Sequence, residues 1–585
     1  MLDIVIRGGS VVDGTGGPAV RADVGIRDGR VVDVGDVGKS GARVIDAAGR
    51  VVCPGFVDVH THYDGQVLWD ATLSPSPLHG VTTVVAGNCG LSLAPVREED
   101  EDFLVRMFSR VEAIPLPSLQ QGISFRWRSF GEFLDVVAGV APVVNVGFLA
   151  GHSALRRLVM GARASSDTAS PAELSSMCAA LDAALAAGAL GFSSSTATTQ
   201  KDGDGVPTPP NFAAPLELVR LASVCRAHPG TSLEFIPAGA ARGFDREELS
   251  LMARMSLAAN APLNWNTVLL NYPAIPDIHE RQLASFDAGA SAGGCVVPMI
   301  VPHNFRVRTD FLDSDVGFRP IAAFDEVFAS DVDGRVRALS DPDVRSRLAK
   351  AMADLPSGSA AMFRDALPDL IVSDTGAPGL AALVGRRVAD IARERSTSVI
   401  EAIFDLAVEA RLDIGFVRHT FPIDDPSRRA VRRQVLRDPR LVLGASDGGA
   451  HVRGVVNVEY TTASFRELVR DEPVFTLEEL VQELTSVPAR LYGLTGRGTL
   501  QPGAWADVVI FDPSAVASSP VSLARDLPGG AARLFSSGVG IDHVLVNGTV
   551  IVSGGAFTGD APGRVLRSGR DTGPIRTDWL LARRA

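Results

Sequence analysis

Hydrophobic and polar residues alternate in short runs near both ends of the chain. These runs lie at 3–7, 23–27, 30–34, 507–511, 543–547 and 549–552. Alternation with a period of two predicts half-buried β-strands. Asp28-Gly29 and Asn547-Gly548 separate neighbouring runs, and both dipeptides are typical of tight hairpin turns. We therefore expect a small β-sandwich domain built from residues 1–53 together with residues 497–585.

The middle of the chain alternates apolar, β-branched runs with helix signals. The apolar runs lie at 51–59, 82–86, 143–149, 189–193, 232–237, 262–268, 294–301 and 441–445. The segments that begin at Ser170 and Thr476 have the spacing of capping boxes, which open helices. Eight buried strands alternating with helices predict an α/β fold, namely a (β/α)₈ TIM barrel over residues 54–496.

One long segment interrupts the regular spacing of the strands. Residues 302–440 separate the seventh apolar run from the eighth, and they contain helical patterns at 341–355, 380–393 and 398–410. We expect this segment to form an insertion, or lid, above the barrel before its last strand.

Composition narrows the class of protein. The 585 residues carry a formal charge of −12, which argues against nucleic-acid partners because these require a basic face. No apolar run approaches the roughly 18 residues of a membrane helix, and no signal peptide is visible. Five cysteines without regular spacing do not form a disulfide framework. We expect a cytoplasmic protein without a membrane partner, for which a homo-oligomer is possible.

The strongest chemical signal stands at the end of the first predicted barrel strand. His60 and His62 are separated by one residue, so their side chains point to the same side of the strand. Active sites of TIM barrels lie at the carboxyl ends of the strands. Imidazole is a common neutral ligand of zinc, so the pair predicts a metal site, although two hydrogen-bonded core histidines are the alternative.

Two further residues follow the second and eighth strands. Cys89 stands in Gly87-Asn88-Cys89-Gly90, where it is either a metal ligand or a small buried thiol. Asp447 precedes two glycines, where it is either a turn residue or a carboxylate that binds a metal and transfers protons. In a closed barrel the eighth strand adjoins the first, so Asp447 can reach the histidine pair.

Several motifs of the chain resemble those of the amidohydrolase superfamily. GFVDVHTHYD, HGVTTVVAGNCG and SDGGAH look like its N-acyl-D-amino-acid deacylase (D-aminoacylase-like) branch, and GRGTLQPGAWADVVIFD is typical of the superfamily. The resemblance implies that His60 and His62 bind one metal and that Cys89 is a thiolate ligand of the same or a neighbouring metal. It also implies that Asp447 is both a ligand and the catalytic general acid/base in the hydrolysis of an amide by an activated water.

The sequence departs from this family at three strands. The segments 232–237 and 262–266 lack the histidines that the family carries on strands five and six, and the fourth strand lacks a lysine. These absences favour one zinc ion over two. Glu234, on the fifth strand, is either a replacement oxygen ligand or a hydrogen-bonded acid.

The remaining candidates concern the substrate. His152 ends the third strand and His451 follows Asp447, so each either binds substrate or has a structural role; Arg453 is a candidate partner for a substrate carboxylate. The resemblance implies a small-molecule amide substrate, in the first place an N-acyl D-amino acid. The alternatives are a hydrolase of a cyclic amide, imide or formamide, and a catalytically silent barrel that binds a small molecule.

Overall fold

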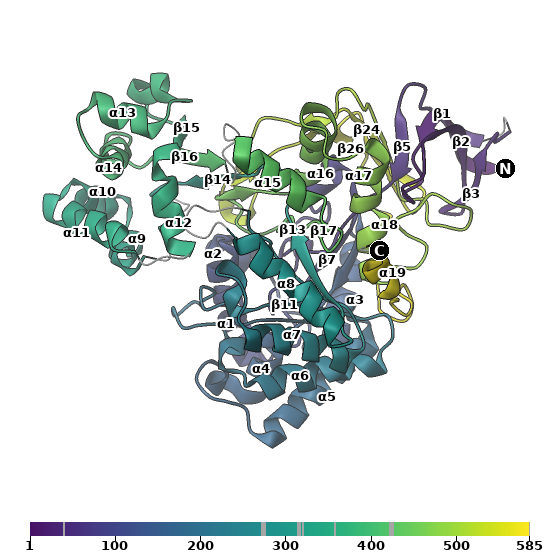
Figure 1. Cartoon of the computed structure of the whole chain (residues 1–585), viewed down its shortest axis with the longest axis horizontal. Coiled ribbons are helices and arrows are strands. Elements are labelled where there is room, and N and C mark those ends of the chain that lie inside the picture. Colours follow the sequence, from purple (N-terminus) through teal and green to yellow (C-terminus); the bar gives the residue numbers. More distant parts are fainter. Residues whose placement is uncertain are drawn as a thin grey trace.

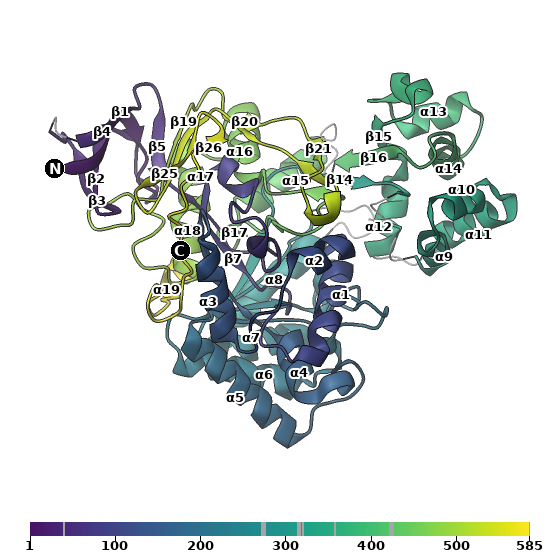
Figure 2. The same ribbon diagram turned by 180° about the vertical axis from the view of Figure 1, so that it is seen from behind.

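Eight parallel strands form the centre of the computed structural model, which describes residues 1–38, 41–270, 277–312, 317–318, 321–355, 359–419 and 426–583. Helices surround these strands, a β-sheet from both chain ends lies on one side, and a helical lobe projects from the other (Figures 1 and 2). Among the described residues, no helix combines the length and the apolar character needed to cross a membrane.

The barrel strands follow one another in chain order. They are β6 (Phe56–Asp58), β7 (Val81–Ala86), β8 (Asn145–Phe148) with its continuation β9 (Ala150–Gly151), β10 (Gly191–Ser195), β11 (Ser232–Ile236), β12 (Leu263–Trp265), β13 (Val296–Ile300) and β17 (Val442–Leu443). The ladders between neighbouring strands along this order, from β6 to β17, are all parallel. A parallel bridge between Thr61 and Gly448 joins the segments that follow β6 and β17. The predicted barrel is therefore confirmed.

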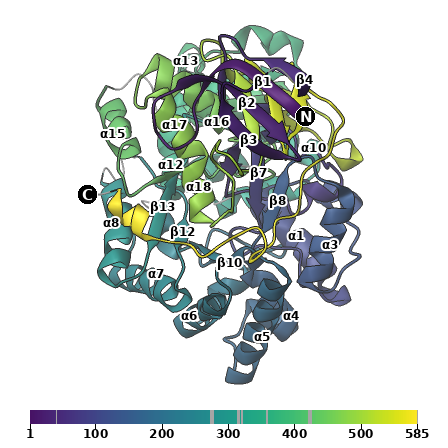
Figure 3. The ribbon, with the colours of Figure 1, turned by 90° about the vertical axis from the view of Figure 1, so that its right-hand side faces the viewer.

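Helices pack around the barrel strands (Figure 3). Those with the clearest sequence signals are α5 (Pro171–Ala187) and α17 (Leu477–Leu484), and both begin with the predicted capping box. In α5 the Ser170 side chain accepts a hydrogen bond from the Glu173 amide, and the Glu173 carboxylate accepts one from the Ser170 amide. Gly188 ends this helix at φ 115°, a left-handed conformation that glycine adopts without steric cost.

The run 51–59, predicted as one strand, is two strands that belong to different sheets. β5 (Val51–Pro54) pairs with β19 (Val508–Phe511) in the terminal sheet, whereas β6 pairs with β7 in the barrel. The chain passes between the two sheets at Gly55, whose amide donates a hydrogen bond to the Asp507 carbonyl. A Cβ atom at Gly55 would lie 2.1 Å from Thr82 Oγ1, so this crossing requires glycine.

Both chain ends contribute to one nine-stranded sheet, and its centre joins them through β5 and β19. Its other strands are β1 (Leu2–Val11), β2 (Val20–Arg27), β3 (Arg30–Gly35), β4 (Gly41–Asp46), β24 (Ile541–Val546), β25 (Thr549–Ser553) and β26 (Ala556–Phe557). The two predicted hairpins, β2–β3 and β24–β25, are present. The domain limits at residues 53 and 497 stay a prediction.

Most of the segment between β13 and β17 forms the projecting lobe of Figures 1 and 2, whereas its last helix (residues 426–436) packs on the barrel core through Val435 and Leu436. Its main elements are β14 (Arg306–Thr309), α10 (Val332–Ser340), α11 (Pro342–Ala353), β15 (Ile371–Thr375), α13 (Val388–Glu394), α14 (Val399–Glu409), β16 (Ile414–His419) and α15 (Pro426–Leu436). A separate apolar core, rich in phenylalanine, stabilises it. β14 also pairs with β18 (Val455–Val456), which follows the last barrel strand, so the lobe is linked to the loop that carries Asp447.

A buried polar network connects the terminal sheet to the barrel. The Asp507 carboxylate contacts Arg497 and accepts hydrogen bonds from the Asn547 amide (2.8 Å) and from Asn145 Nδ2 (3.3 Å). Asn145 begins barrel strand β8. Arg497 also donates to Asn547 Oδ1 at 3.0 Å. Because Asp507 and Arg497 are both buried, each charge depends on the other for compensation.

Removal of this carboxylate should destabilise the protein. We expect Asp507→Ala to lower the free energy of unfolding by about 3–5 kcal/mol, because it leaves the buried Arg497 charge without its partner. Asp354→Ala is the control, since Asp354 pairs with Lys350 on the exposed surface and its loss should leave the free energy of unfolding nearly unchanged. Urea unfolding followed by circular dichroism measures both, and equal losses would contradict the role of the network.

Candidate metal centre

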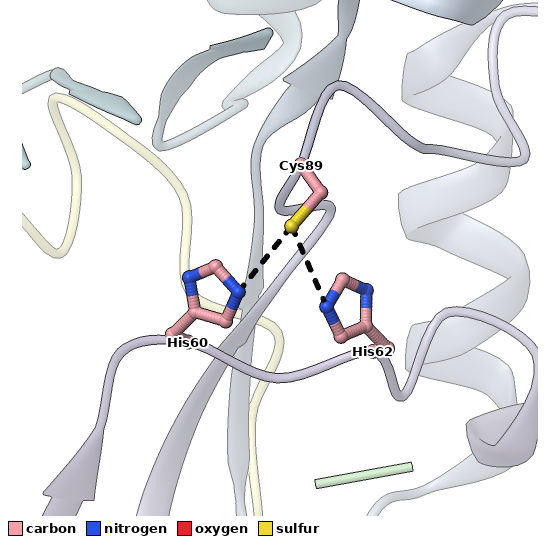
Figure 4. A group of neighbouring side chains, drawn as sticks. All are labelled: His60, His62 and Cys89. Carbon is pink, nitrogen blue, oxygen red and sulfur yellow. Dashed lines mark hydrogen bonds between the residues drawn. The ribbon is translucent and has the colours of Figure 1, made fainter. Parts of the chain in front are cut away.

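Three side chains converge just beyond the first two barrel strands. His60 and His62 follow β6, and their rings lie 5.3 Å apart between centroids. The Sγ atom of Cys89, which follows β7, lies 3.5 Å from His60 Nε2 and 3.9 Å from His62 Nε2 (Figure 4). All three residues are buried. Although both histidines lie beyond the end of β6, their one-residue spacing brings both imidazoles to one thiol, as the sequence predicts.

Asp447 reaches the same point from the eighth strand. Its Oδ1 atom lies 3.3 Å from His60 Nε2 and 3.7 Å from His62 Nε2. Asp447 and Cys89 both adopt left-handed backbone conformations, at φ 52° and φ 57°. Such conformations are uncommon outside glycine and cost on the order of 1–3 kcal/mol each in sparsely populated regions. The backbone is therefore strained at Asp447 and at Cys89, the two residues that join the histidine pair.

The donor types of this cluster fit a zinc ion. Zinc binds imidazole nitrogen, carboxylate oxygen and thiolate sulfur at about 2.0–2.3 Å, which places neighbouring ligand atoms about 3.3–3.8 Å apart. The ligand atoms of His60, His62 and Cys89 all lie within 4.8 Å of one another, and Asp447 Oδ1 approaches the two imidazoles at 3.3 and 3.7 Å. Two nitrogens, one sulfur and one oxygen are also the donor types that zinc accepts.

The charges of the cluster follow from its burial. Burial lowers the pKa of His62 to about 3, so this imidazole is neutral, as a metal ligand must be. Burial opposes ionisation of Asp447, but the hydrogen bond and charge of His60 outweigh it and lower the pKa of this carboxyl to about 2. Asp447 is therefore ionised at neutral pH.

The other two donors hold protons more tightly than usual. Burial, together with the carboxylates of Glu234 and Glu112, raises the pKa of the Cys89 thiol. Burial opposes protonation of His60, yet its hydrogen bond to Asp447 is strong enough that the pKa of the imidazole is raised. A metal ion must therefore displace protons from this site when it binds.

Metal affinity should accordingly depend on pH. Because the pKa values of His60 and Cys89 are raised without metal, both groups lose protons when zinc binds, and protons then compete with zinc. We expect the zinc affinity to fall as the pH is lowered from about 8 to about 6. Chelator competition at several pH values measures this, and isothermal titration in buffers of different ionisation enthalpy counts the protons released. A pH-independent affinity would contradict it.

Strands five and six carry an acid and an amide where the family resemblance implies histidines. Glu234 on β11 is fully buried, and its Oε2 atom accepts a hydrogen bond from the Cys89 amide at 2.8 Å. Its Oε1 atom has no hydrogen-bond partner among the described residues. Burial raises the pKa of Glu234 to about 7. The carboxylate thus positions the backbone of Cys89, and its role as a metal ligand stays a prediction.

Sequence reasoning missed two residues at this site. Asn266 follows β12, and its Nδ2 atom lies 3.1 Å from His60 Nε2. Glu112, at the end of a helix after the second strand, lies 3.5 Å from His62 Nδ1 through Oε1. No motif marks either residue. The available signal for Glu112 was a carboxylate at a helix carboxyl end, where the helix dipole disfavours it.

The two histidines predicted to bind substrate have different surroundings. His152 begins α4 (His152–Met160), where Nδ1 shares a 2.8 Å hydrogen bond with Ser194 Oγ and Nε2 one of 2.8 Å with Glu217 Oε1. Both ring nitrogens are therefore engaged within the protein, which favours a packing role. His451 is partly exposed, and its Nε2 lies 4.0 Å from Glu112 Oε2. Arg453 donates from Nε to the Ala532 carbonyl.

Comparisons with known proteins agree with this arrangement. Residues 43–552 match the model of the amidohydrolase family. An uncharacterised protein of Mycobacterium tuberculosis is 32% identical over 97% of this chain and 95% of its own length. The D-aminoacylase of Alcaligenes xylosoxydans xylosoxydans is 28% identical over 96% of this chain and 97% of its own.

Solved structures give the same result. A D-aminoacylase superposes on this chain with a TM-score of 0.64 at 27% identity, covering 97% of this chain and 100% of the other. That structure was studied for the role of its binuclear metal centre, with one-metal activation and second-metal attenuation. The N-acyl-D-glutamate deacylase of Bordetella bronchiseptica, in complex with zinc and a phosphonate inhibitor, superposes with a TM-score of 0.65 at 26% identity, covering 97% and 99%.

Proposed function

Because the chain belongs to the amidohydrolase family, we propose that it is a metal-dependent hydrolase that removes the acyl group from N-acyl D-amino acids. One observation carries this proposal. Four side chains able to bind zinc, His60, His62, Cys89 and Asp447, converge at the carboxyl ends of strands one, two and eight. That position is where TIM barrels hold their catalytic groups.

The similar proteins support the substrate class. Three relatives of Alcaligenes xylosoxydans xylosoxydans, 28–29% identical over nearly the whole chain, are a D-aminoacylase, an N-acyl-D-aspartate deacylase and an N-acyl-D-glutamate deacylase. All three names describe removal of an acyl group from a D-configured amino acid. The side chain and the acyl group differ among such relatives, so the proposal names the bond and the configuration only.

The donor set supports one metal ion. Glu234 on strand five and Asn266 just after strand six offer a carboxylate and an amide in place of imidazoles. His60, His62 and Asp447 would hold the ion, with Cys89 as the fourth ligand. The D-aminoacylase neighbour is described as activated by one metal and attenuated by a second, which supports an enzyme that works with a single ion.

Each group at the site then has a separate role in amide hydrolysis. Bound zinc would polarise the amide carbonyl and make a water molecule more acidic. Asp447, whose lowered pKa of about 2 makes it a carboxylate at neutral pH, accepts a proton from the attacking water and delivers it to the leaving nitrogen. A carbon–oxygen bond forms and the carbon–nitrogen bond then breaks. The second proton of the water also passes to the leaving amine, so the products are a carboxylate and an ammonium group. Glu234 holds the Cys89 backbone in place by accepting a hydrogen bond from its amide.

Loss of the Asp447 carboxylate should stop hydrolysis without emptying the site. We expect Asp447→Asn to lower kcat by about 10²–10⁴, since the amide side chain cannot transfer the proton, while His60, His62 and Cys89 keep metal bound. Asp182→Asn is the control, because Asp182 is an exposed partner of His228. Release of amino acid and metal content by mass spectrometry measure both effects. Wild-type turnover by Asp447→Asn would contradict the proposed role.

A substrate panel separates the proposal from its alternatives. We expect hydrolysis of N-acetyl D-amino acids, little hydrolysis of the L-isomers, and none of hydantoins or formamides, by zinc-loaded protein assayed for free amine. Activity confined to a cyclic amide, imide or formamide would contradict the proposal and support the alternative of a hydrolase for that class of substrate. Tight binding of an N-acyl amino acid without turnover, by fully loaded protein, would indicate a binding barrel.

A further inference from the structure

A buried glutamate ends the helix that packs beside the metal centre. Glu112 is the last residue of α1 (Glu101–Glu112), and its side chain is only 3% exposed. A negative charge at a helix carboxyl end lies against the negative end of the helix dipole. Burial of a carboxylate costs further free energy unless other groups compensate. The helix dipole and burial both disfavour a glutamate at this position, so we expect its carboxylate to have a specific partner.

The first partner is His62. Glu112 Oε1 lies 3.5 Å from His62 Nδ1, the ring nitrogen that points away from the cluster. This separation is an ion-pair distance and not a hydrogen bond, and among the described residues His62 Nδ1 has no hydrogen-bond partner. Phe108, one helical turn before Glu112, places its ring edge-on to His62 at 6.4 Å between centroids. Residues four apart share one helix face, so α1 presents both an aromatic ring and a carboxylate to this imidazole.

The second partner is the loop that carries Asp447. The amide of His451 donates to the Glu112 carbonyl at 2.5 Å, and His451 Nε2 lies 4.0 Å from Glu112 Oε2. His451 is four residues beyond Asp447, and the Ala450 amide donates to the Asp447 carbonyl at 2.8 Å, which makes this a tight turn. Glu112 thus contacts one predicted ligand directly and another through a short loop.

We propose that Glu112 is a positioning residue of the metal centre, which orients His62 through its Nδ1–H and the Asp447 loop through His451. A histidine that donates one ring N–H to a carboxylate presents the other nitrogen, here Nε2, as a fixed and more basic donor. This inference rests on the proposed function, because it takes His62 and Asp447 as metal ligands. It adds a carboxylate that touches neither the substrate nor the metal.

The test measures zinc affinity and not only turnover. We expect Glu112→Ala to weaken zinc binding by about 10–100-fold, the usual effect of removing such a partner. Glu112→Gln keeps the shape of the side chain but loses the charge that makes His62 more basic, so we expect a smaller loss, on the order of threefold or more. Chelator competition gives the affinities, and the visible spectrum of the cobalt-loaded protein should shift in both variants.

A matched control comes from another buried glutamate that contacts a histidine. Glu217 bonds His152 Nε2 at 2.8 Å outside the metal cluster, so Glu217→Gln should leave zinc affinity and the cobalt spectrum unchanged. If Glu112→Ala does not fold, Glu112→Gln decides: wild-type affinity with an unchanged cobalt spectrum would overturn the inference while the proposed function stands. If wild-type protein binds neither zinc nor cobalt, the proposed function itself fails.

Discussion

Backbone hydrogen bonds between the segments after β6 and β17 hold the metal centre together. The His62 amide donates to the Gly448 carbonyl at 2.7 Å, and the Asp447 amide donates to the His60 carbonyl at 3.1 Å. These bonds close the barrel at the point where its first and last strands meet, although the two segments are separated by about two thirds of the chain. The distances from Asp447 to both imidazoles depend on this closure, because no covalent or local constraint brings the residues together. The metal centre is thus a consequence of the topology, and a barrel left open here would have no site.

The same region concentrates features that a purely structural core avoids. Cys89 and Asp447 have left-handed backbones, and Gly448 lies so close to Tyr63 that an added Cβ would be 2.9 Å from the Tyr63 hydroxyl. Several buried polar atoms nearby have no hydrogen-bond partner among the described residues, namely His60 Nδ1, Glu234 Oε1, Asn264 Oδ1 and Asn266 Oδ1. Each feature destabilises the fold by itself. Their coincidence around four metal-binding donors is better explained by a bound ion and substrate than by packing.

Sequence patterns predicted the elements that depend on local rules. The capping boxes at Ser170 and Thr476 and the two hairpins depend on contacts within a few residues, and all are present. The periodicity of two also placed His60 and His62 on one side of their strand. The split of 51–59 was not predictable, because it depends on Thr82 and Asp507, which are distant in the sequence. The surroundings of His152 were not predictable for a similar reason, because its partner Glu217 lies on α6 (Pro215–Val224) and no pattern links the two; its role in substrate binding stays a prediction.

The loop after the eighth strand is held by three separate parts of the molecule. Its beginning bonds to the segment after β6, its middle bonds to Glu112 at the end of α1, and its end forms β18, which pairs with β14 of the projecting lobe. Because Asp447 lies at the start of this loop, a displacement of α1 or of the lobe would be transmitted to it through only a few residues. The long insertion before the last strand therefore has a structural connection to the chemistry, even though its own apolar core is separate from that of the barrel. Anchoring at both ends also explains how a loop with left-handed residues can keep a single conformation, since the strain at Asp447 is opposed by hydrogen bonds on either side.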